Sequence, residues 1–349
     1  MKKWRIIFFI LGLAGLAVLI IQSDPTQYNW QEILSRDLFL ILLGQLVIWA
    51  VIYFIHVVVY KDILGKEYFK EVGWARMTRI CLTGFALNNV TPAGLVGGEP
   101  YRIMELKPFC GTEKATSSTL TFTVFYTMGH VLLWVTGTVF YFLLGAPGEI
   151  STSILLAISG IVLGFACFAF IRSRSHGFIM PLFRFFGKLP LISRLTNKLL
   201  EKHGEQYTNI DREISEFSHD RRVFRRVLLL EYLTRLLEAG EYFFIFKMLG
   251  ENISYPGGLV IMSMASLIGN VFFMIPMQAG TRESGMTIGV NWLGLSDGSG
   301  FMGGLLYRVR ELLCIAVGIS LILIGKTVKN RIEKRNTASS DHDAAEKQQ

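Results

Sequence analysis

Long apolar runs alternate with short polar stretches along most of the chain, and this pattern predicts a series of membrane-spanning helices. About 20 apolar residues are needed for one crossing. Six runs reach or approach that length, namely residues 6–21, 38–60, 118–145, 153–171, 227–249 and 301–325. The first run follows a basic start and ends without the small-residue site of a cleaved signal peptide, so we expect a retained helix.

Two further segments begin apolar and then break. Residues 79–107 contain "NNVTPAGLVGGEPYRIMELK", and residues 257–295 contain "FFMIPMQAGTRESG". In the first, Pro92 interrupts any helix, while Gly97 and Gly98 permit positive φ and close backbone approach. Irregular backbone at membrane depth is tolerated only where it is buried in protein or lines a polar cavity.

The charges of the loops indicate how these two segments cross. Cytoplasmic loops of membrane proteins are enriched in Lys and Arg. The basic stretches are the N-terminus, residues 61–79, residues 172–226 and the tail after Lys326, and all four are expected to be cytoplasmic. The loops poor in Lys and Arg are residues 22–37, 146–152 and 250–256, and these are expected outside. Every loop lies on the side expected from its charge only if each broken segment returns to the side from which it entered, as a re-entrant hairpin.

The two hairpins also share a spacing. Pro92 and Glu99 are seven positions apart, as are Pro276 and Glu283. Together with the alternating topology, this match predicts an inverted repeat, with a first half at about 38–145 and a second at about 227–325. The predicted fold is therefore an all-α polytopic membrane protein with about six full transmembrane helices and two opposed re-entrant hairpins.

These elements are expected to form a single integral membrane domain over residues 1–325. Residues 172–226 show apolar positions at helical spacing among many cations, which predicts a cytoplasmic amphipathic insert on the inner leaflet. Residues 326–349 are expected to be a disordered cytoplasmic tail. Both termini then lie in the cytoplasm.

Composition supports the membrane and limits the chemistry. Hydrophobic residues make up 51% of the 349 residues and charged ones only 18%, which is too apolar for an ordinary soluble domain. The net charge of +8 resides in the loops, so orientation in the membrane explains it better than nucleic-acid binding. The four cysteines show no metal-ligand spacing, and no nucleotide, hydrolase or dinucleotide motif occurs. No cofactor or metal is expected, and an enzyme is less expected than a transporter.

Charged side chains inside the apolar runs are candidates for function, because each costs about 2.5–3.5 kcal/mol to insert. Glu231, Arg235 and Glu238 recur at spacings of four and three on one helical face. They either form salt bridges near the cytoplasmic end or face the same polar cavity as the hairpins. His56 and His130 are expected to be hydrogen-bonded core residues. The candidate substrate-binding residues are Asn89, Pro92, Gly97, Gly98, Glu99, Arg102, Glu231, Arg235, Glu238, Asn270, Pro276, Gly280, Arg282 and Glu283.

The segments "TPAGLVGGEPYRIMELK" and "IPMQAGTRESG" resemble the paired motifs of the transmembrane flippase region of bacterial lysylphosphatidylglycerol synthases and their stand-alone relatives. The resemblance spans about residues 5–325. Two glycines usual in the second motif are replaced here by Met277 and Gln278, so the second turn is expected to be less flexible. The soluble aminoacyl-transferase domain of the full synthases is absent from the sequence.

The resemblance implies a multi-pass protein of the bacterial cytoplasmic membrane that moves a phospholipid or another lipid, such as a polyprenyl-linked or glycolipid, between leaflets. Arg102 and Arg282 are expected to contact a lipid phosphate, and Glu99 and Glu283 to hold these arginines or exchange protons. The expected partners are membrane lipids with anionic or phosphate-bearing head groups, and a lipid-synthesising enzyme. The alternatives are a membrane enzyme, or an accessory subunit, acting on lipid-linked sugars or phosphates.

Overall fold

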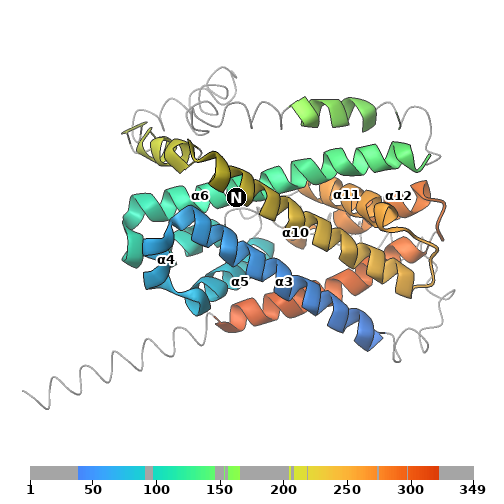
Figure 1. Ribbon diagram of the computed structural model, residues 1–349. Coiled ribbons are helices and arrows are strands. Elements are labelled where there is room, and N and C mark those ends of the chain that lie inside the picture. The colour runs from blue at the N-terminus through green and yellow to red at the C-terminus, as the bar shows by residue number, and fades with distance from the viewer. Residues whose placement is uncertain are drawn as a thin grey trace, which may run out of the picture.

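The computed structural model describes residues 38–90, 97–145, 153, 156–165, 204–205, 208–217, 219–272, 275–296 and 298–321. The described residues form helices joined by short turns, with no strand among them, so they are all-α as expected. Figure 1 shows long helices packed side by side, with α3 and α10 crossing the front of the bundle together.

The first half starts with α3 (Leu38–Leu64), followed by the short α4 (Lys66–Val72) and by α5 (Trp74–Val90). The next helix, α6 (Gly98–Leu143), is continuous in hydrogen bonding but breaks at Gly111, whose φ of 77° and ψ of 172° are not helical. Only glycine adopts such a backbone readily. The first half therefore begins with the long helix α3 and ends with a second long helix from residue 112 onward. Between them lie two shorter helical segments, α5 and the part of α6 before Gly111, which we call the arms of the first broken segment.

The second half follows the same order. A helix at 208–217 precedes α10 (Arg221–Met248), which Asp220 caps by accepting hydrogen bonds from two backbone amides at its start. Then comes α11 (Tyr255–Val271), capped by the Ser254 side chain. Such caps satisfy amides that have no partner inside the helix. The start of α10 lies within the stretch expected to be the cytoplasmic insert, so the helix begins earlier than the apolar run predicted.

The second broken segment continues through η4 (Pro276–Gln278) into α12 (Thr281–Trp292), and a helix at 299–321 completes the half. Gly280 precedes α12 with a φ of 79°, which suits a glycine. Met277 and Gln278 also have positive φ, of 56° and 52°, although both carry side chains.

Small residues let the arms of each broken segment approach closely. A Cβ on Gly98 would lie 2.3 Å from the carbonyl oxygen of Gly84 in α5, and a Cβ on Gly285 would lie 2.6 Å from the Cα of Ala265 in α11. Close backbone approach through small residues is a common way for helices to pack in membranes. The glycines thus hold α5 against α6, and α11 against α12.

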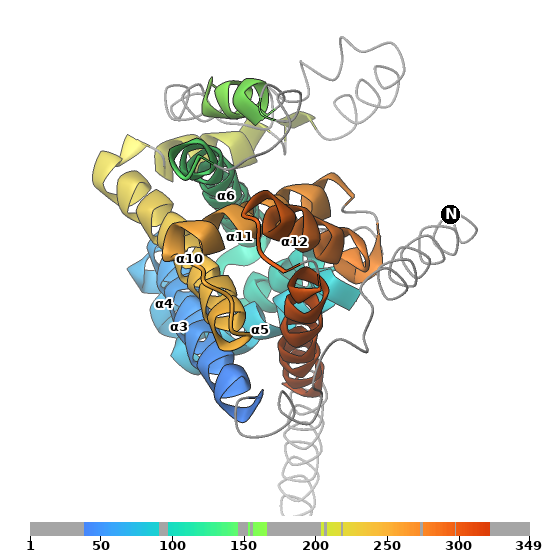
Figure 2. The ribbon, with the colours of Figure 1, turned by 90° about the vertical axis from the view of Figure 1, so that its right-hand side faces the viewer.

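Contacts between the halves are extensive. The long helices α3 and α10 pack together, and α11 packs against α6, where the Ser263 hydroxyl donates to the carbonyl of Leu133. The helix at 299–321 crosses α5, where the Thr83 hydroxyl donates to the carbonyl of Gly318. Figure 2, turned by 90°, shows α6, α11 and α12 gathered beside one another. The first arm of each half, α5 or α11, therefore lies against a long helix of the other half.

Two of the described helices, α3 and α6, are long and apolar enough to cross a membrane by length and composition. The helices α10 and 299–321 also coincide with predicted runs, but each carries several charged side chains that lower its apolarity. Of the run at 153–171, residues 156–165 form an apolar helix. The predicted run at 6–21, most of the insert and the C-terminal tail lie outside the described residues.

Candidate functional site

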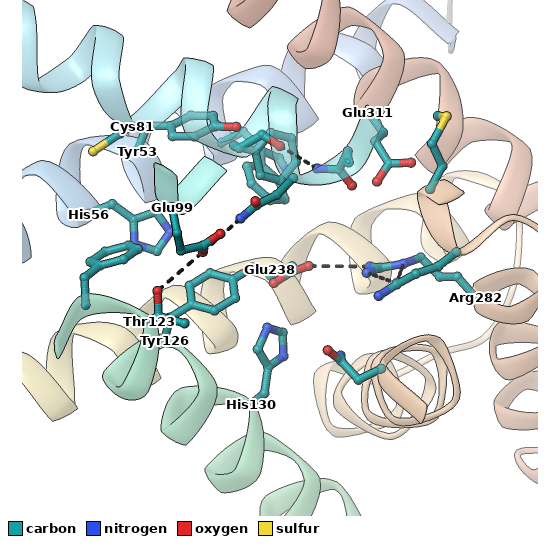
Figure 3. Close-up of a pocket in the computed structure, with 18 of the residues that line it drawn as sticks. Tyr53, His56, Cys81, Glu99, Thr123, Tyr126, His130, Glu238, Arg282 and Glu311 are labelled. Atoms are coloured by element: carbon teal, nitrogen blue, oxygen red, sulfur yellow. Dashed lines mark hydrogen bonds and ion pairs between the residues drawn. The ribbon is translucent and has the colours of Figure 1, made fainter. Parts of the chain in front are cut away.

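A cavity of about 110 Å³ lies where the broken segments meet the long helices. Both halves contribute to its wall, and Figure 3 shows side chains from several helices pointing into it. Its polar and charged lining consists of Tyr53, His56, Cys81, Asn88, Asn89, Glu99, Arg102, Thr123, Tyr126, His130, Glu238, Asn270, Gln278, Arg282, Tyr307 and Glu311. Trp49, Phe85, Phe122, Ile275 and Met277 complete it.

The start of α6 brings a carboxylate and a guanidinium to this cavity. Glu99 accepts hydrogen bonds from the Asn88 side chain at 3.2 Å and from the Thr123 hydroxyl at 3.4 Å. Arg102 reaches Glu99 only at 3.5 Å, and its guanidinium lies 5.1 Å from the centre of the Phe122 ring. Among the described residues, its Nε has no hydrogen-bond partner. Arg102 is 6% exposed. A buried guanidinium held this loosely keeps unused donors for an anion.

Asn88 also closes the turn between the arms. Its side-chain oxygen accepts from the backbone amide of Gly98 at 2.6 Å, while its amide nitrogen donates to Glu99. One side chain of α5 thus fixes both the backbone at the start of α6 and the carboxylate one residue later. The neighbouring Asn89 donates to the carbonyl of Phe85 in its own helix.

The second broken segment supplies Arg282. Gln278 accepts two hydrogen bonds from this guanidinium, at 2.7 and 3.1 Å, and the Tyr307 hydroxyl lies 2.6 Å from its Nη1. Glu238 in α10 lies 3.9 Å away, the distance drawn as a dashed line in Figure 3. Arg282 is therefore fixed mainly by neutral groups, and its positive charge is only partly balanced at the cavity wall.

The polar face of α10 borders the same space. Arg235 donates to Glu238 at 2.6 Å and to His130 Nε2 at 3.2 Å, and it lies 4.5 Å from the centre of the Tyr126 ring. His130 Nδ1 lies 3.0 Å from the Ser266 hydroxyl in α11. This face was expected either to form salt bridges or to line the polar cavity. The structure shows a feature of each kind: Arg235 and Glu238 form an i,i+3 ion pair, and Glu238 also lines the cavity.

Glu283 lies behind the cavity rather than on its wall. It accepts from Arg308 Nε at 2.5 Å, and Arg308 also pairs with Glu311. The same arginine donates to the backbone carbonyls of Met277 at 2.6 Å and Gln278 at 3.2 Å. Glu283 was expected to hold Arg282, but it holds Arg308 because the helix at 299–321 brings a closer cation to it. Arg308 in turn braces the second turn.

Two further buried carboxylates lie on α10. Glu231 is 0% exposed and lies 3.1 Å from His56 Nδ1. Glu241 forms a fully buried ion pair with Arg310 at 2.9 Å and accepts from Gln45 and Trp49 of α3. Both carboxylate oxygens of Glu241 accept hydrogen bonds, which offsets the cost of burying the charge. The ion pair thus links α10 to α3 and to the helix at 299–321.

The structure divides the residues predicted for the site into three groups. The cavity is lined by Asn89, Glu99, Arg102, Glu238, Asn270 and Arg282. The residues beside it are Glu231, Arg235 and Glu283, and those that shape the turns are Gly97, Gly98 and Gly280. Gly97 has a φ of −87°, so close packing at Gly98, and not positive φ at Gly97, is the role of this pair. Pro276 begins η4, and Pro92 lies outside the described residues.

Sequence reasoning missed several cavity residues. Tyr53, Thr123, Tyr126 and Tyr307 belong to apolar runs, where a lone hydroxyl gives no signal. Gln278 was noticed only as a departure from glycine, yet it accepts both hydrogen bonds described above from Arg282. Among the described residues, no group of three or more His, Cys, Asp or Glu side chains is placed to hold a metal ion.

Comparison with protein families gives one match. The family described as the lysylphosphatidylglycerol synthase TM region matches residues 6–318, which is most of the chain. The chain belongs to this family. A search of curated proteins and a search of solved structures found no significant match.

Membership of the lysylphosphatidylglycerol synthase TM family makes the chain a membrane protein, in agreement with the apolar helices α3 and α6. The family takes its name from the transmembrane region of lysylphosphatidylglycerol synthase. The charged cavity therefore belongs to a helical bundle whose surroundings are a bilayer.

Proposed function

We propose that the protein is a flippase-like transporter that moves a phosphate-bearing lipid between the leaflets of the cytoplasmic membrane. The head group passes through the charged cavity while the acyl chains stay in the bilayer. The observation that carries this proposal is the pair of cavity arginines, Arg102 and Arg282, one from each half. Guanidinium groups are well suited to phosphate, because they present several donors in one plane.

The two arginines differ in how completely they are already bound. Arg282 has neutral acceptors on Gln278 and Tyr307. Arg102 has one long ion pair with Glu99 and an unpartnered Nε. A phosphate entering the cavity would gain most at Arg102, where donors are unused, and would add a second contact at Arg282. The carboxylates of Glu99, Glu238 and Glu311 limit how tightly an anion is held, which favours release.

The helix order supports two opposed halves. Each half consists of a long helix, two arms that meet at a break, and a second long helix. Corresponding helices of the two halves also make corresponding contacts. The first long helices, α3 and α10, pack on each other. The first arm of each half packs on the last long helix of the other, α5 on the helix at 299–321 and α11 on α6. In transporters built from inverted repeats, substrates bind near the midplane where broken helices meet. We infer the same arrangement here, with six spans and two re-entrant hairpins.

Leaflet exchange in vesicles tests the proposal. The purified protein is reconstituted with a trace of fluorescent phosphatidylglycerol, and a membrane-impermeant quencher reports the fraction of the label that reaches the outer leaflet with time. We expect exchange above that of protein-free vesicles, and a loss of about tenfold or more in Arg102→Gln and in Arg282→Ala, since a charge-assisted hydrogen bond is worth roughly 1.5–3 kcal/mol. Glu99→Gln should also change the rate.

Arg225→Ala is the matched control, because Arg225 is an exposed arginine near the start of α10, outside the cavity. Its rate should equal that of the wild type. Equal rates in the wild type and in both cavity variants would contradict the proposed site. Mass spectrometry of the vesicle lipids after the assay separates transport from the enzymatic alternative, because an enzyme acting on the lipid would change its mass.

A further inference from the structure

The numbers of positively and negatively charged side chains around the cavity are unequal. Among the described residues, the cavity wall and the groups directly behind it contain five arginines and six glutamates. The arginines are Arg102, Arg235, Arg282, Arg308 and Arg310, and the glutamates are Glu99, Glu231, Glu238, Glu241, Glu283 and Glu311. In a low-dielectric interior an unbalanced charge is costly, so one carboxylate must find its counter-charge elsewhere.

Glu231 is the carboxylate left without an arginine. Every other glutamate in the set lies within ion-pair distance of a guanidinium, whereas the ion-pair partner of Glu231 is His56. The side chain of Glu231 is 0% exposed, and its Oε2 has no hydrogen-bond partner in the part of the chain that the structure describes. A carboxylate this deeply buried, with one oxygen unpaired, is costly unless a counter-charge is supplied beside it.

His56 connects this carboxylate to the cavity. Its imidazole lines the cavity wall (Figure 3). Its Nδ1 lies 3.1 Å from Glu231 Oε1. With Nδ1 donating to the carboxylate, a further proton adds at Nε2 and turns the ring into an imidazolium. The pair then changes from a net charge of −1 to zero, which balances the surplus carboxylate.

The second cavity histidine cannot serve in this way. Nε2 of His130 accepts a hydrogen bond from Arg235, and its Nδ1 faces the Ser266 hydroxyl. An added proton would have to sit on Nε2, pointing at a guanidinium that already donates there. His130 is therefore held neutral, and His56 is the imidazole that can change its charge.

Groups on every neighbouring helix face the His56 and Glu231 pair. The aromatic hydroxyls of Tyr53 in α3 and Tyr126 in α6 lie on rings 6.4 and 5.9 Å from the imidazole. Cys81 in α5 and Arg235 in α10 interact electrostatically with Glu231, and His130 in α6 does so with His56. The hydrogen bonds of Arg235 go to Glu238 and His130 rather than to Glu231, and a second cation, Arg102, interacts electrostatically with Cys81 and Tyr126.

We propose that His56 and Glu231 form a proton-binding site open to the cavity, and that its proton is the coupling ion of the transport cycle. The coupling rests on the proposed function. A lipid phosphate in the cavity adds a negative charge near His56, so bound phosphate and bound proton stabilise each other, and each raises the affinity for the other by the same factor. Loss of the proton favours release of the head group.

Nuclear magnetic resonance on the whole protein in detergent tests the proton site without transport. With ¹⁵N-labelled histidine, the resonance of His56 is assigned by its loss in His56→Gln, and its Nε2 signal is followed from about pH 5 to 9, the range around an ordinary imidazole. We expect one pH-dependent step in the Nε2 signal of His56 in the wild type, and a displaced step in Glu231→Gln. His219→Gln, which removes an exposed histidine, should leave that step unchanged.

The pH dependence of leaflet exchange then tests the coupling in the same vesicles as above. We expect exchange to vary with pH in the wild type and in His219→Gln, and to lose that dependence in His56→Gln. A His56 signal that does not change over the whole pH range would overturn the proton site. A titrating His56 together with the same pH profile in His56→Gln and wild type would overturn the coupling and leave the transport proposal standing.

A wild type with no exchange at any pH would instead contradict the proposed function and with it the coupling, while the resonance of His56 still decides the proton site. Circular dichroism and gel filtration of each variant show whether it is folded. Because the titration is observed in the wild type, a variant that fails to fold does not remove the test.

Discussion

The two breaks in the helices look equivalent in the sequence but contribute differently to the cavity. In the first, Glu99 and Arg102 both line the wall. In the second, Arg282 lines the wall, while Glu283 turns away and binds Arg308. The carboxylate nearest Arg282 is Glu238, from α10. The Pro-to-Glu spacing therefore identified corresponding positions in the two halves. Whether the glutamate at each position lines the cavity depends on which side chains of other helices contact it.

The turns also differ in how they are held. Asn88 bridges the first turn by contacting both the Gly98 amide and Glu99. The asparagine near the second turn, Asn270, donates to Ser266 in its own helix. There Arg308 does the bridging, through two backbone carbonyls of the turn. A neutral amide thus holds the first turn, and a charged group from a different helix holds the second.

The largest expected difference between the halves is their orientation. In a variant without the four natural cysteines, Glu113→Cys lies just after the first pair of arms and Ser296→Cys just after the second, and both positions are exposed. If the halves are inverted, a membrane-impermeant thiol reagent added outside cells should label Ser296→Cys only. Glu113→Cys should react only after the cells are made permeable. Labelling of both from the same side would contradict the inverted repeat.

A second pair of substitutions tests whether close packing of the two arms contributes equally to stability in both halves. Gly98→Ala and Gly285→Ala each place a Cβ closer than 3 Å to backbone of the opposite arm. Each should destabilise the protein by about 1–3 kcal/mol, because a packed contact cannot accept the extra methyl group. Gly164→Ala, with nothing within 4 Å of the added Cβ, is the control and should be neutral or slightly stabilising. Thermal denaturation in detergent measures all three. A large loss in only one half would show that its arms alone depend on close approach.

The carboxylates at the matched positions should separate stability from transport. Glu283→Gln replaces a charged acceptor 2.5 Å from Arg308, so we expect it to cost roughly 1.5–3 kcal/mol. Glu99→Gln should cost less than Glu283→Gln, because its ion pair is 3.5 Å long and Asn88 and Thr123 remain as neighbours. Denaturation midpoints compare the two. Equal losses would mean that Glu99 is as structural as Glu283.

Much of the fold followed from the sequence, because membrane helices depend on local apolarity and on Gly and Pro breaks. The runs at α3 and 299–321 and the positions of both breaks were predicted within a few residues, whereas α10 begins six residues earlier than its run. The site was only partly predictable. The pairing of Glu231 with His56 joins positions 175 residues apart, and no local pattern encodes it. Arg282 and Tyr307 likewise meet only because the helix at 299–321 crosses α12.

The smallest expected effects concern Met277 and Gln278, where the resemblance described above led us to expect glycines. Both residues have positive φ, which costs a residue with a side chain roughly 1–2 kcal/mol. Met277→Gly removes that strain and keeps the carbonyl that Arg308 contacts, but it makes the unfolded chain more flexible. We expect a net gain of at most about 1 kcal/mol.

Gln278→Gly relieves the same strain but also removes both hydrogen bonds to Arg282. The loss of a side chain that positions a buried guanidinium outweighs the relief, so this variant should be less stable than Met277→Gly and slower in leaflet exchange. Denaturation midpoints and exchange rates of the two variants, measured side by side, check this difference. A more stable and equally active Gln278→Gly would show that the second turn needs only its backbone, and that Arg282 is positioned by Tyr307 and Glu238 alone.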